Sequence, residues 1–210
     1  MHDKFPYFSP DLARESVADT EKLNYDELVM LLQHDDLENQ IYQGNITLAM
    51  VRPNVGPTAN IFGLSDMDCA EKIEEMIEGL GVLAKFSVIF SEEIVEEFYD
   101  GEPKEVMLRA EPENPDEYDN RWPEFVKFMA SGPTTIILLH SPNGDAIPQW
   151  RKHLGHWNIE KYRDEATIRG KLAVNVFNNL VHGSDAPESV LRELAIIRKC
   201  LEVELSTDAD

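Results

Sequence analysis

One histidine near the C-terminal end of the chain lies among residues that suit a reactive site. His182 stands within the sequence Asn-Asn-Leu-Val-His-Gly-Ser-Asp at residues 178–185. We expect this segment to form a turn between a strand and a helix, where small neighbours let the imidazole ring project into a cleft. Ser184 and Asp185 would cap the helix that follows, because their side-chain oxygens can accept hydrogen bonds from its first backbone N–H groups.

His182 could act as a nucleophile that accepts a phosphoryl group. Such chemistry requires a carboxylate that orients the imidazole and cations that hold the phosphate. Glu193 could supply the carboxylate from the predicted helix, and Arg151 and Arg169 could supply the cations. An ordinary exposed side chain is the commoner role of a lone loop histidine, so these residues by themselves leave both interpretations open.

The charge of the chain narrows the class of ligand. Its 210 residues include 40 acidic and 19 basic side chains, which gives a formal net charge of −21. Such a surface repels nucleic-acid backbones and anionic membranes, so we expect neither as a partner. We expect the arginines near His182 to form a local region of positive charge, which an anionic substrate needs. With 42% hydrophobic residues, the chain suffices for one sizeable core with a small extension.

Cysteine content and the absence of long apolar runs bear on the compartment. The two cysteines, Cys69 and Cys200, have no spacing typical of a disulfide framework or a zinc site. The sequence has neither a signal-like start nor an apolar run of ~20 residues that could span a bilayer. We therefore expect a cytoplasmic protein without a metal held by its own side chains, in which the neighbouring His153 and His156 are surface residues.

The elements that would position the reactive residues follow from hydrophobic periodicity. Apolar runs predict strands, and apolar residues at helical spacing with suitable caps predict helices. Strands are expected over residues 47–52, 82–90, 134–139 and 171–177, and helices over residues 65–80 (closed by Gly81), 91–99 and 187–203. Strands that alternate with helices indicate an open sheet covered by helices, although periodicity does not order the strands.

The chain is expected to have an extension, a main domain and a short tail. In the extension, residues 1–45, leucines at helical spacing predict an amphipathic helix over residues 19–40 that ends near Gly44. This helix would either pack on its own domain, which we favour, or dock on a partner. The main domain, residues 46–204, contains an acidic, proline-containing insertion, and the tail is expected to be frayed. The insertion comprises residues 100–120, which we expect to form a loop, and the tail residues 205–210.

Several motifs together resemble one enzyme family. The sequence His-Gly-Ser-Asp at residues 182–185, with Glu-Ser at 188–189, is similar to the active-site signature of nucleoside diphosphate kinases, Asn-x-x-His-Gly-Ser-Asp-x-x-Glu-Ser. Further matches occur in the family's order: Met-Val-Arg-Pro-Asn at 50–54, Lys-Phe-Met-Ala-Ser-Gly-Pro at 127–133 and Thr-Ile-Arg-Gly at 167–170. The resemblance extends over about residues 46–197, and the histidine signature combined with Ser-Gly-Pro is highly specific.

The resemblance implies a fold and an activity. Members of this family have an α+β fold, with a ferredoxin-like four-stranded antiparallel sheet flanked by helices. They pass the terminal phosphoryl group of a nucleoside triphosphate to a histidine and then to a nucleoside diphosphate, with magnesium bridging the phosphates. The resemblance implies that His182 is the nucleophile, that Glu193 holds its ring and that Tyr99 lies beside it. A homo-oligomer is usual in this family.

The resemblance also implies a set of nucleotide-binding residues. Arg151 and Arg169 match the two arginines that clamp phosphates, a role in which a planar guanidinium group outperforms lysine. Asn179 matches the asparagine that touches the ribose, and Val176 matches the aliphatic residue under the base. Trp122 is the nearest candidate for the aromatic lid over the base, since the acidic insertion interrupts the helical hairpin that normally carries it.

Two substitutions depart from the family pattern at the nucleotide site. Arg52 replaces a lysine that contacts phosphate and ribose, which keeps the charge but changes its length and shape. Trp157 replaces a threonine that donates a hydrogen bond to a phosphate, and an indole is bulkier with its single donor elsewhere. Both changes predict weakened catalysis, while His182 remains.

One further segment distinguishes a subgroup and leaves two functions open. Residues 146–155 resemble the Ala-x-x-x-Trp-Arg-x-x-x-Gly segment of divergent kinase-like domains in ciliary and flagellar axonemal proteins, although Trp150 could simply fill a core position. The first hypothesis is a phosphoryl-transfer enzyme. The second is a nucleotide-binding or structural module of an axonemal assembly, with a protein partner bound through the N-terminal helix or the insertion.

Overall fold

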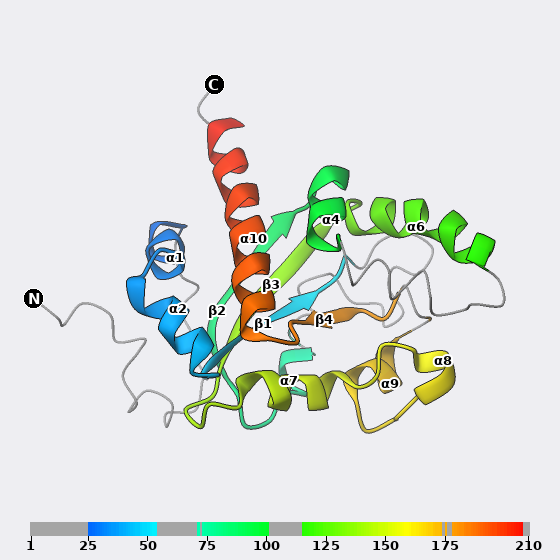
Figure 1. Cartoon of the computed structure of the whole chain (residues 1–210), viewed down its shortest axis with the longest axis horizontal. Coiled ribbons are helices and arrows are strands. Elements are labelled where there is room, and N and C mark those ends of the chain that lie inside the picture. Colours follow the sequence, from blue (N-terminus) through cyan, green and yellow to red (C-terminus); the bar gives the residue numbers. More distant parts are fainter. Residues whose placement is uncertain are drawn as a thin grey trace, which may run out of the picture.

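The computed structural model describes residues 25–53, 71, 73–100, 115–173, 175 and 178–207. The helices are α1 (Tyr25–Leu32), α2 (Asp35–Tyr42), α4 (Glu92–Phe98), α6 (Pro115–Met129), α7 (Ala146–Leu154), α8 (Ile159–Tyr162), α9 (Ile168–Leu172) and α10 (Pro187–Thr207). The strands are β1 (Ile46–Val51), β2 (Gly81–Ile89), β3 (Pro133–His140) and β4 (Val181–Gly183) (Figure 1). Cys69 and Val176 lie outside the described residues. None of the described helices is long and apolar enough to cross a membrane.

The sheet has the antiparallel, ferredoxin-like arrangement that the resemblance implies. Its strand order is β2-β3-β1-β4, and all three neighbouring pairs are antiparallel. β1 and β3 occupy the centre, and every residue of β1 is buried. Because both faces of these central strands are covered, their sequences are mainly apolar runs, with a few buried threonines, instead of alternating ones. Among the described strands, β4 lies at the edge and pairs with β1.

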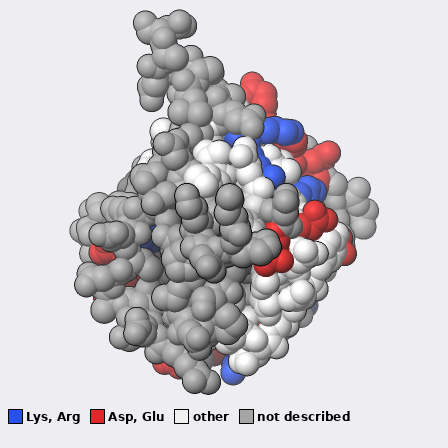
Figure 2. Space-filling view, turned by 90° about the vertical axis from the view of Figure 1, so that its left-hand side faces the viewer, with Lys and Arg blue, Asp and Glu red and all other residues white. Residues whose placement is uncertain are grey.

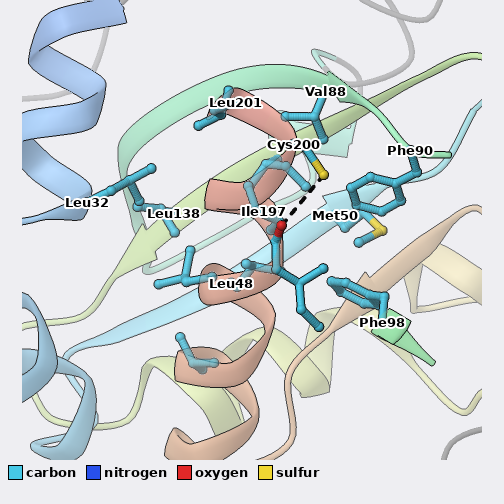
Figure 3. Packing of buried hydrophobic residues seen from close by; sticks show 14 of the residues in the cluster. Leu32, Leu48, Met50, Val88, Phe90, Phe98, Leu138, Ile197, Cys200 and Leu201 are labelled. Carbon is cyan, nitrogen blue, oxygen red and sulfur yellow. Dashed lines mark hydrogen bonds between the residues drawn. The ribbon is translucent and has the colours of Figure 1, made fainter. Parts of the chain in front are cut away.

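The two faces of the sheet carry separate hydrophobic clusters. Successive side chains of a strand point to opposite faces, so Leu48 and Met50 of β1 enter one cluster while Ala49 and Val51 enter the other. The first cluster lies under α10, α4, α6, α1 and α2, and Figure 3 shows α10 packed over residues of β1, β2 and β3. The second lies under α7 and α9. β4 therefore has helices of one layer on one face and helices of the other layer on the opposite face.

The fourth strand was predicted at the wrong place. Lys171 and Leu172, where the predicted strand would begin, belong to α9 instead, since Thr167 begins that helix by accepting a hydrogen bond from the backbone N–H of Gly170 at 3.1 Å; residues 174, 176 and 177 lie outside the described residues. Leu172 is buried as the last residue of that helix. The actual strand, β4, comprises only three residues. The helix predicted at 187–203 continues to Thr207, so residues 205–207 of the expected tail are helical.

The described part of the N-terminal extension, residues 25–45, packs on its own domain, which is the alternative that we favoured. The predicted single helix is two helices, because His34 has extended backbone angles and its ring Nδ1 accepts a hydrogen bond from Asp36 N at 3.2 Å. The buried apolar residues of α1 and α2 belong to the first cluster: Leu28, Leu31, Leu32, Leu37 and Ile41. Figure 2 shows the side of the molecule on which α1 and α2 lie, where the described acidic and basic groups are interspersed.

Two boundaries near the sheet also differ from the predictions. Gly81 does not close the preceding helix, because it is the first residue of β2, and the left-handed backbone conformation occurs at Gly79 with a φ of 77°. Residues 115–120, the end of the segment expected to be a loop, are helical, since α6 begins at Pro115; residues 101–114 of that segment lie outside the described residues. Proline is favoured in a first helical turn because its missing N–H would have no intrahelical partner there.

Candidate active site

His182 is the central residue of β4. It pairs with Met50 of β1, and it is half-buried between the buried residues Val181 and Gly183. The expectation that it lies on a turn after a strand was wrong. The tight backbone feature is instead at Leu180, whose φ of 68° places it in the left-handed region immediately before the strand. His182 is consequently anchored by sheet pairing and not by a loop.

A buried carboxylate from α10 fixes the orientation of the His182 ring. Its Nε2 lies 3.1 Å from Oε1 of Glu193, which is 3% exposed. The other carboxylate oxygen accepts a hydrogen bond from the Ser184 hydroxyl at 2.6 Å. Arg192 Nη2 lies 3.6 Å from Oε1 and adds a positive charge beside the carboxylate. Since an ionised carboxylate can only accept, the proton belongs on Nε2, and Nδ1 of His182 is left with its lone pair.

Two aromatic side chains at the end of α4 hold the same ring from its sides. Phe98 and Tyr99 contact His182 edge-on, with ring centroids 5.4 Å and 5.8 Å away. Arg192 donates a hydrogen bond from Nη1 to the Phe98 carbonyl at 2.9 Å, which ties α10 to α4. Burial raises the pKa of the Tyr99 hydroxyl, and Arg52 only partly opposes this effect. Tyr99 is therefore neutral at physiological pH.

Arg52 extends from the end of β1 into a buried polar cluster. Its Nη1 donates to Asn179 Oδ1 at 2.6 Å, and its Nη2 donates to the Tyr99 hydroxyl at 3.2 Å. The guanidinium group lies over the rings of Phe125 and Tyr99, at 5.3 Å and 5.7 Å from their centroids. The predicted residues Arg52, Tyr99 and Asn179 are thus brought together, and Phe125 of α6 is an addition that the sequence did not indicate.

Two further guanidinium groups flank the strand that carries His182. Arg169 donates from Nη1 to the Gly155 carbonyl and from Nη2 to the Val181 carbonyl, both at 3.0 Å. The exposed Arg151 donates from Nη1 to the Gly183 carbonyl at 3.5 Å. These contacts place both predicted phosphate-clamping arginines beside His182. They also link each arginine to the backbone of β4.

The electrostatics around Arg169 favour a bound anion. Burial, followed by the like charges of Arg52 and Arg151, lowers the pKa of Arg169 to about 9. Its Nε is buried and has no hydrogen-bond partner among the described residues. A buried cation near other cations is costly unless negative charge compensates it. A phosphate group would supply that charge together with hydrogen-bond acceptors.

The three tryptophans have different surroundings. Trp122, the candidate lid residue, is 6% exposed, donates to Glu96 Oε1 at 2.7 Å and packs on Phe125, so its side chain belongs to the α4–α6 layer. Trp157 is half-buried, and its ring stacks on His156 at 5.8 Å. Trp150 is fully buried on α7, and its Nε1 donates to the His182 carbonyl at 3.3 Å.

Some contacts were not found by sequence reasoning. Ser184 was expected to cap α10, but its hydroxyl bonds to Glu193 instead. Asp185 accepts a hydrogen bond from Ser189, which lowers the pKa of its carboxyl. The contribution of Arg192 could have been suspected, because it directly precedes Glu193 on the helix. Phe98 gave no comparable signal, since an apolar residue before Tyr99 is equally expected in a core.

Comparisons with known proteins agree with this geometry. The family model described as nucleoside diphosphate kinase matches residues 45–203. Nucleoside diphosphate kinases of Brucella canis and Brucella suis are 44% identical over 72 residues, which cover 34% of this chain and 49% of each relative, so the chain spans about half the length of the curated relatives it matches.

Solved structures extend the likeness over more of the chain. The nucleoside diphosphate kinase of Aquifex aeolicus is 26% identical with a TM-score of 0.51, covering 73% of this chain and 94% of that one. The enzyme from Encephalitozoon cuniculi is also 26% identical with a TM-score of 0.51, covering 72% and 87%. With the family model matching most of its length and the histidine signature within that match, this chain belongs to the nucleoside diphosphate kinase family.

Proposed function

We propose that this chain transfers a phosphoryl group from a nucleoside triphosphate to a nucleoside diphosphate through a phosphorylated His182. The observation that carries the proposal is the 3.1 Å contact between His182 Nε2 and the buried Glu193. This contact leaves the lone pair of Nδ1 as the nucleophile. The guanidinium groups of Arg151 and Arg169 donate hydrogen bonds to backbone carbonyls of β4, the strand that carries His182. Nucleophile, orienting base and anion-binding cations are the parts that phosphoryl transfer requires.

The transfer consists of two displacements at phosphorus. In the first, Nδ1 of His182 forms a bond to the terminal phosphorus while the bond from that phosphorus to the bridging oxygen breaks, and the nucleoside diphosphate departs. The imidazole then carries the phosphoryl group on Nδ1 and a proton on Nε2, and the Glu193 carboxylate stabilises the positive charge of the ring. In the second, a terminal oxygen of another nucleoside diphosphate attacks the phosphorus, and Nδ1 leaves with its electron pair.

The chain's residues fit a magnesium ion that arrives with the nucleotide. Among the described residues, no group of three or more His, Cys, Asp or Glu side chains could hold a metal by itself. Magnesium is commonly held by one or two carboxylates together with substrate phosphates. Asp185 is the carboxylate suited to this role, because the hydrogen bond from the Ser189 hydroxyl, together with the nearby charge of Arg151, lowers the pKa of its carboxyl. The ion would neutralise phosphate charge during transfer.

The second candidate is a nucleotide-binding or catalytically weak structural module in a ciliary or flagellar axonemal assembly. Two features support it. Arg52 already holds the side chain of Asn179 at 2.6 Å, so a ribose would have to share or replace that bond. Residues 146–155 resemble a segment of the axonemal subgroup. In this alternative the protein would act in the cytoplasm or the axoneme through a protein partner, and His182 would turn over slowly.

Labelling of the histidine tests the enzymatic proposal. The full chain is incubated with magnesium and ATP labelled at the terminal phosphate, and we expect a label that is stable in base and lost in acid. Adding an unlabelled nucleoside diphosphate should remove the label as a nucleoside triphosphate. His182→Ala should abolish labelling, whereas His153→Ala, a matched change at a histidine bonded to the Glu78 carbonyl on the surface, should not. An unlabelled wild type, or a labelled His182→Ala variant, would refute the proposal.

A further inference from the structure

The short edge strand that carries His182 is held by side chains along its backbone. β4 has three residues, and each of their carbonyls accepts a hydrogen bond from a side-chain N–H group. The donors are Arg169 to Val181 at 3.0 Å, Trp150 to His182 at 3.3 Å and Arg151 to Gly183 at 3.5 Å. A strand with a single neighbour presents unpaired backbone groups on its outer side. Here the register turns the Val181 and Gly183 carbonyls outward, where α9 and α7 supply their donors. The His182 carbonyl instead faces Met50 of β1 and receives Trp150 as an additional donor.

Trp150 differs from the other two donors in chemistry and in burial. The guanidinium groups of Arg151 and Arg169 are charged, so an incoming phosphate competes with the carbonyls for their N–H donors. The indole of Trp150 is neutral and fully buried, and it has a single donor, which the His182 carbonyl already occupies. Trp150 is therefore the member of this set whose bond to the strand does not depend on the ligand.

The indole also packs directly against the strand. α7 runs alongside β4 (Figure 1). A Cβ added at Gly183 would collide with Nε1 and Cδ1 of Trp150 and would also press on Leu154. Glycine at position 183 thus allows the indole to reach the strand backbone. The close fit leaves the His182 carbonyl little freedom to move away from Nε1.

We propose that Trp150 is a positioning residue for the His182 nucleophile. Trp150 belongs to the cluster under α7, while Glu193 reaches His182 from α10 on the other face of the sheet. The backbone of the nucleophile is therefore fixed from one layer and its ring from the other. Such fixation matters because a displacement of about 1 Å can cost a phosphoryl-transfer enzyme much of its rate. This inference rests on the proposed function of His182.

The principal test is Trp150→Phe in the full chain, which keeps an aromatic ring in the core and removes the N–H donor. We expect kcat for transfer to fall about fivefold while KM for the nucleotides changes less than about twofold. Ile137→Val is the matched control, because Ile137 is fully buried in the same cluster and does not contribute a side-chain hydrogen bond. It should lower the denaturation midpoint without lowering kcat. Equal kcat in Trp150→Phe and wild type would overturn the proposal.

A second readout does not require turnover. In the wild type, ¹⁵N spectra of histidine-labelled protein should show one His182 tautomer, with the proton on Nε2. In Trp150→Phe, the His182 signals should shift toward a mixture of tautomers or broaden. Unchanged His182 signals would count against a positioning role. If the wild type transfers no phosphate yet these signals respond as expected, the enzymatic proposal fails while the positioning role of Trp150 stands.

A substitution on β4 itself tests the same contact in case the Trp150→Phe variant folds poorly. Gly183→Ala should push the indole and β4 apart and reduce kcat by a similar factor, again with little effect on KM. Because phenylalanine leaves room for the added methyl group, the double variant should lose less activity than the product of the two single losses. Independent, multiplicative losses would show that Trp150 and the strand are not coupled, and would overturn the proposal.

Discussion

At the residue scale, the site depends on how completely Glu193 is engaged. Its carboxylate is buried, contacts the His182 ring, accepts the Ser184 hydroxyl and lies near Arg192. Each of its two oxygens therefore has a hydrogen-bond partner. The negative charge is what the ring needs when a phosphoryl group on Nδ1 makes the imidazole cationic.

Removing that charge without removing the side chain isolates its contribution. Glu193→Gln should lower the rate of His182 labelling by roughly 10²-fold, because a neutral amide cannot stabilise the cationic ring to the same extent. The measurement is rapid-quench labelling with radioactive ATP. Glu97→Gln is the matched control, since Glu97 forms an exposed ion pair with Lys199. A rate for Glu193→Gln within twofold of the Glu97→Gln rate would contradict the role of the carboxylate.

Tyr99 provides a prediction about pH. Burial raises the pKa of its hydroxyl above the ordinary value of 10.0. Near pH 10 the unfolded chain therefore releases this proton before the folded chain does, so the folded state binds more protons and the free energy of unfolding falls as pH rises. Tyr99→Phe should remove this part of the decrease. Urea unfolding of the wild type and of Tyr99→Phe between about pH 8 and about pH 10.5 measures this contribution. If the difference between their free energies of unfolding does not change with pH, the prediction is wrong.

At the element scale, long elements were predictable from sequence and the shortest strand was not. β1 and β3 are mainly apolar runs buried on both faces, so pattern alone located them. β4 has three residues, too few for a periodic signal, and it is defined by pairing with β1 and by bonds from α7 and α9. The contact between His182 and Glu193 was anticipated from the place of Glu193 on the predicted helix and from the family resemblance. The hydrogen bond from the Ser184 hydroxyl to Glu193 was not predicted, because it depends on the position of β4.

Arg169 joins two elements through its planar shape. It bonds to Gly155 after α7 through Nη1 and to Val181 of β4 through Nη2, and a lysine, with a single terminal nitrogen, lacks this planar fork. Arg169→Lys should lower the free energy of unfolding by about 1–2 kcal/mol and weaken nucleotide binding about tenfold. Denaturant unfolding and calorimetric titration with a nucleoside diphosphate measure the two effects.

Arg163→Lys is the control for that substitution. Arg163 also donates to two carbonyls, those of Gly170 and Ala173, but it does not bond to β4. It should reduce stability by a similar amount and leave nucleotide affinity within about twofold. If both variants bind nucleotide equally well, Arg169 serves only to connect α7 and β4.

At the scale of the whole molecule, the N-terminal helices are part of the main core and not a separate module. α1 and α2 contribute buried leucines to the cluster that also contains residues of α10 and β1. Removing residues 1–44 would therefore expose apolar surface of the domain itself. Any partner bound through this region would have to use its outer side, where Met30 and Tyr42 are exposed.

Leu31 and Met30 are neighbours on α1 that test this integration. Leu31 is 2% exposed within the core cluster, whereas Met30 is 51% exposed. Leu31→Ala should lower the free energy of unfolding by about 3 kcal/mol, through lost burial and the cavity left behind. Met30→Ala should change it by less than about 0.5 kcal/mol. Urea denaturation followed by tryptophan fluorescence gives both values. If α1 were only a detachable docking helix, Leu31→Ala would leave the main unfolding transition unchanged, so a single cooperative transition shifted to lower urea is the outcome that integration requires.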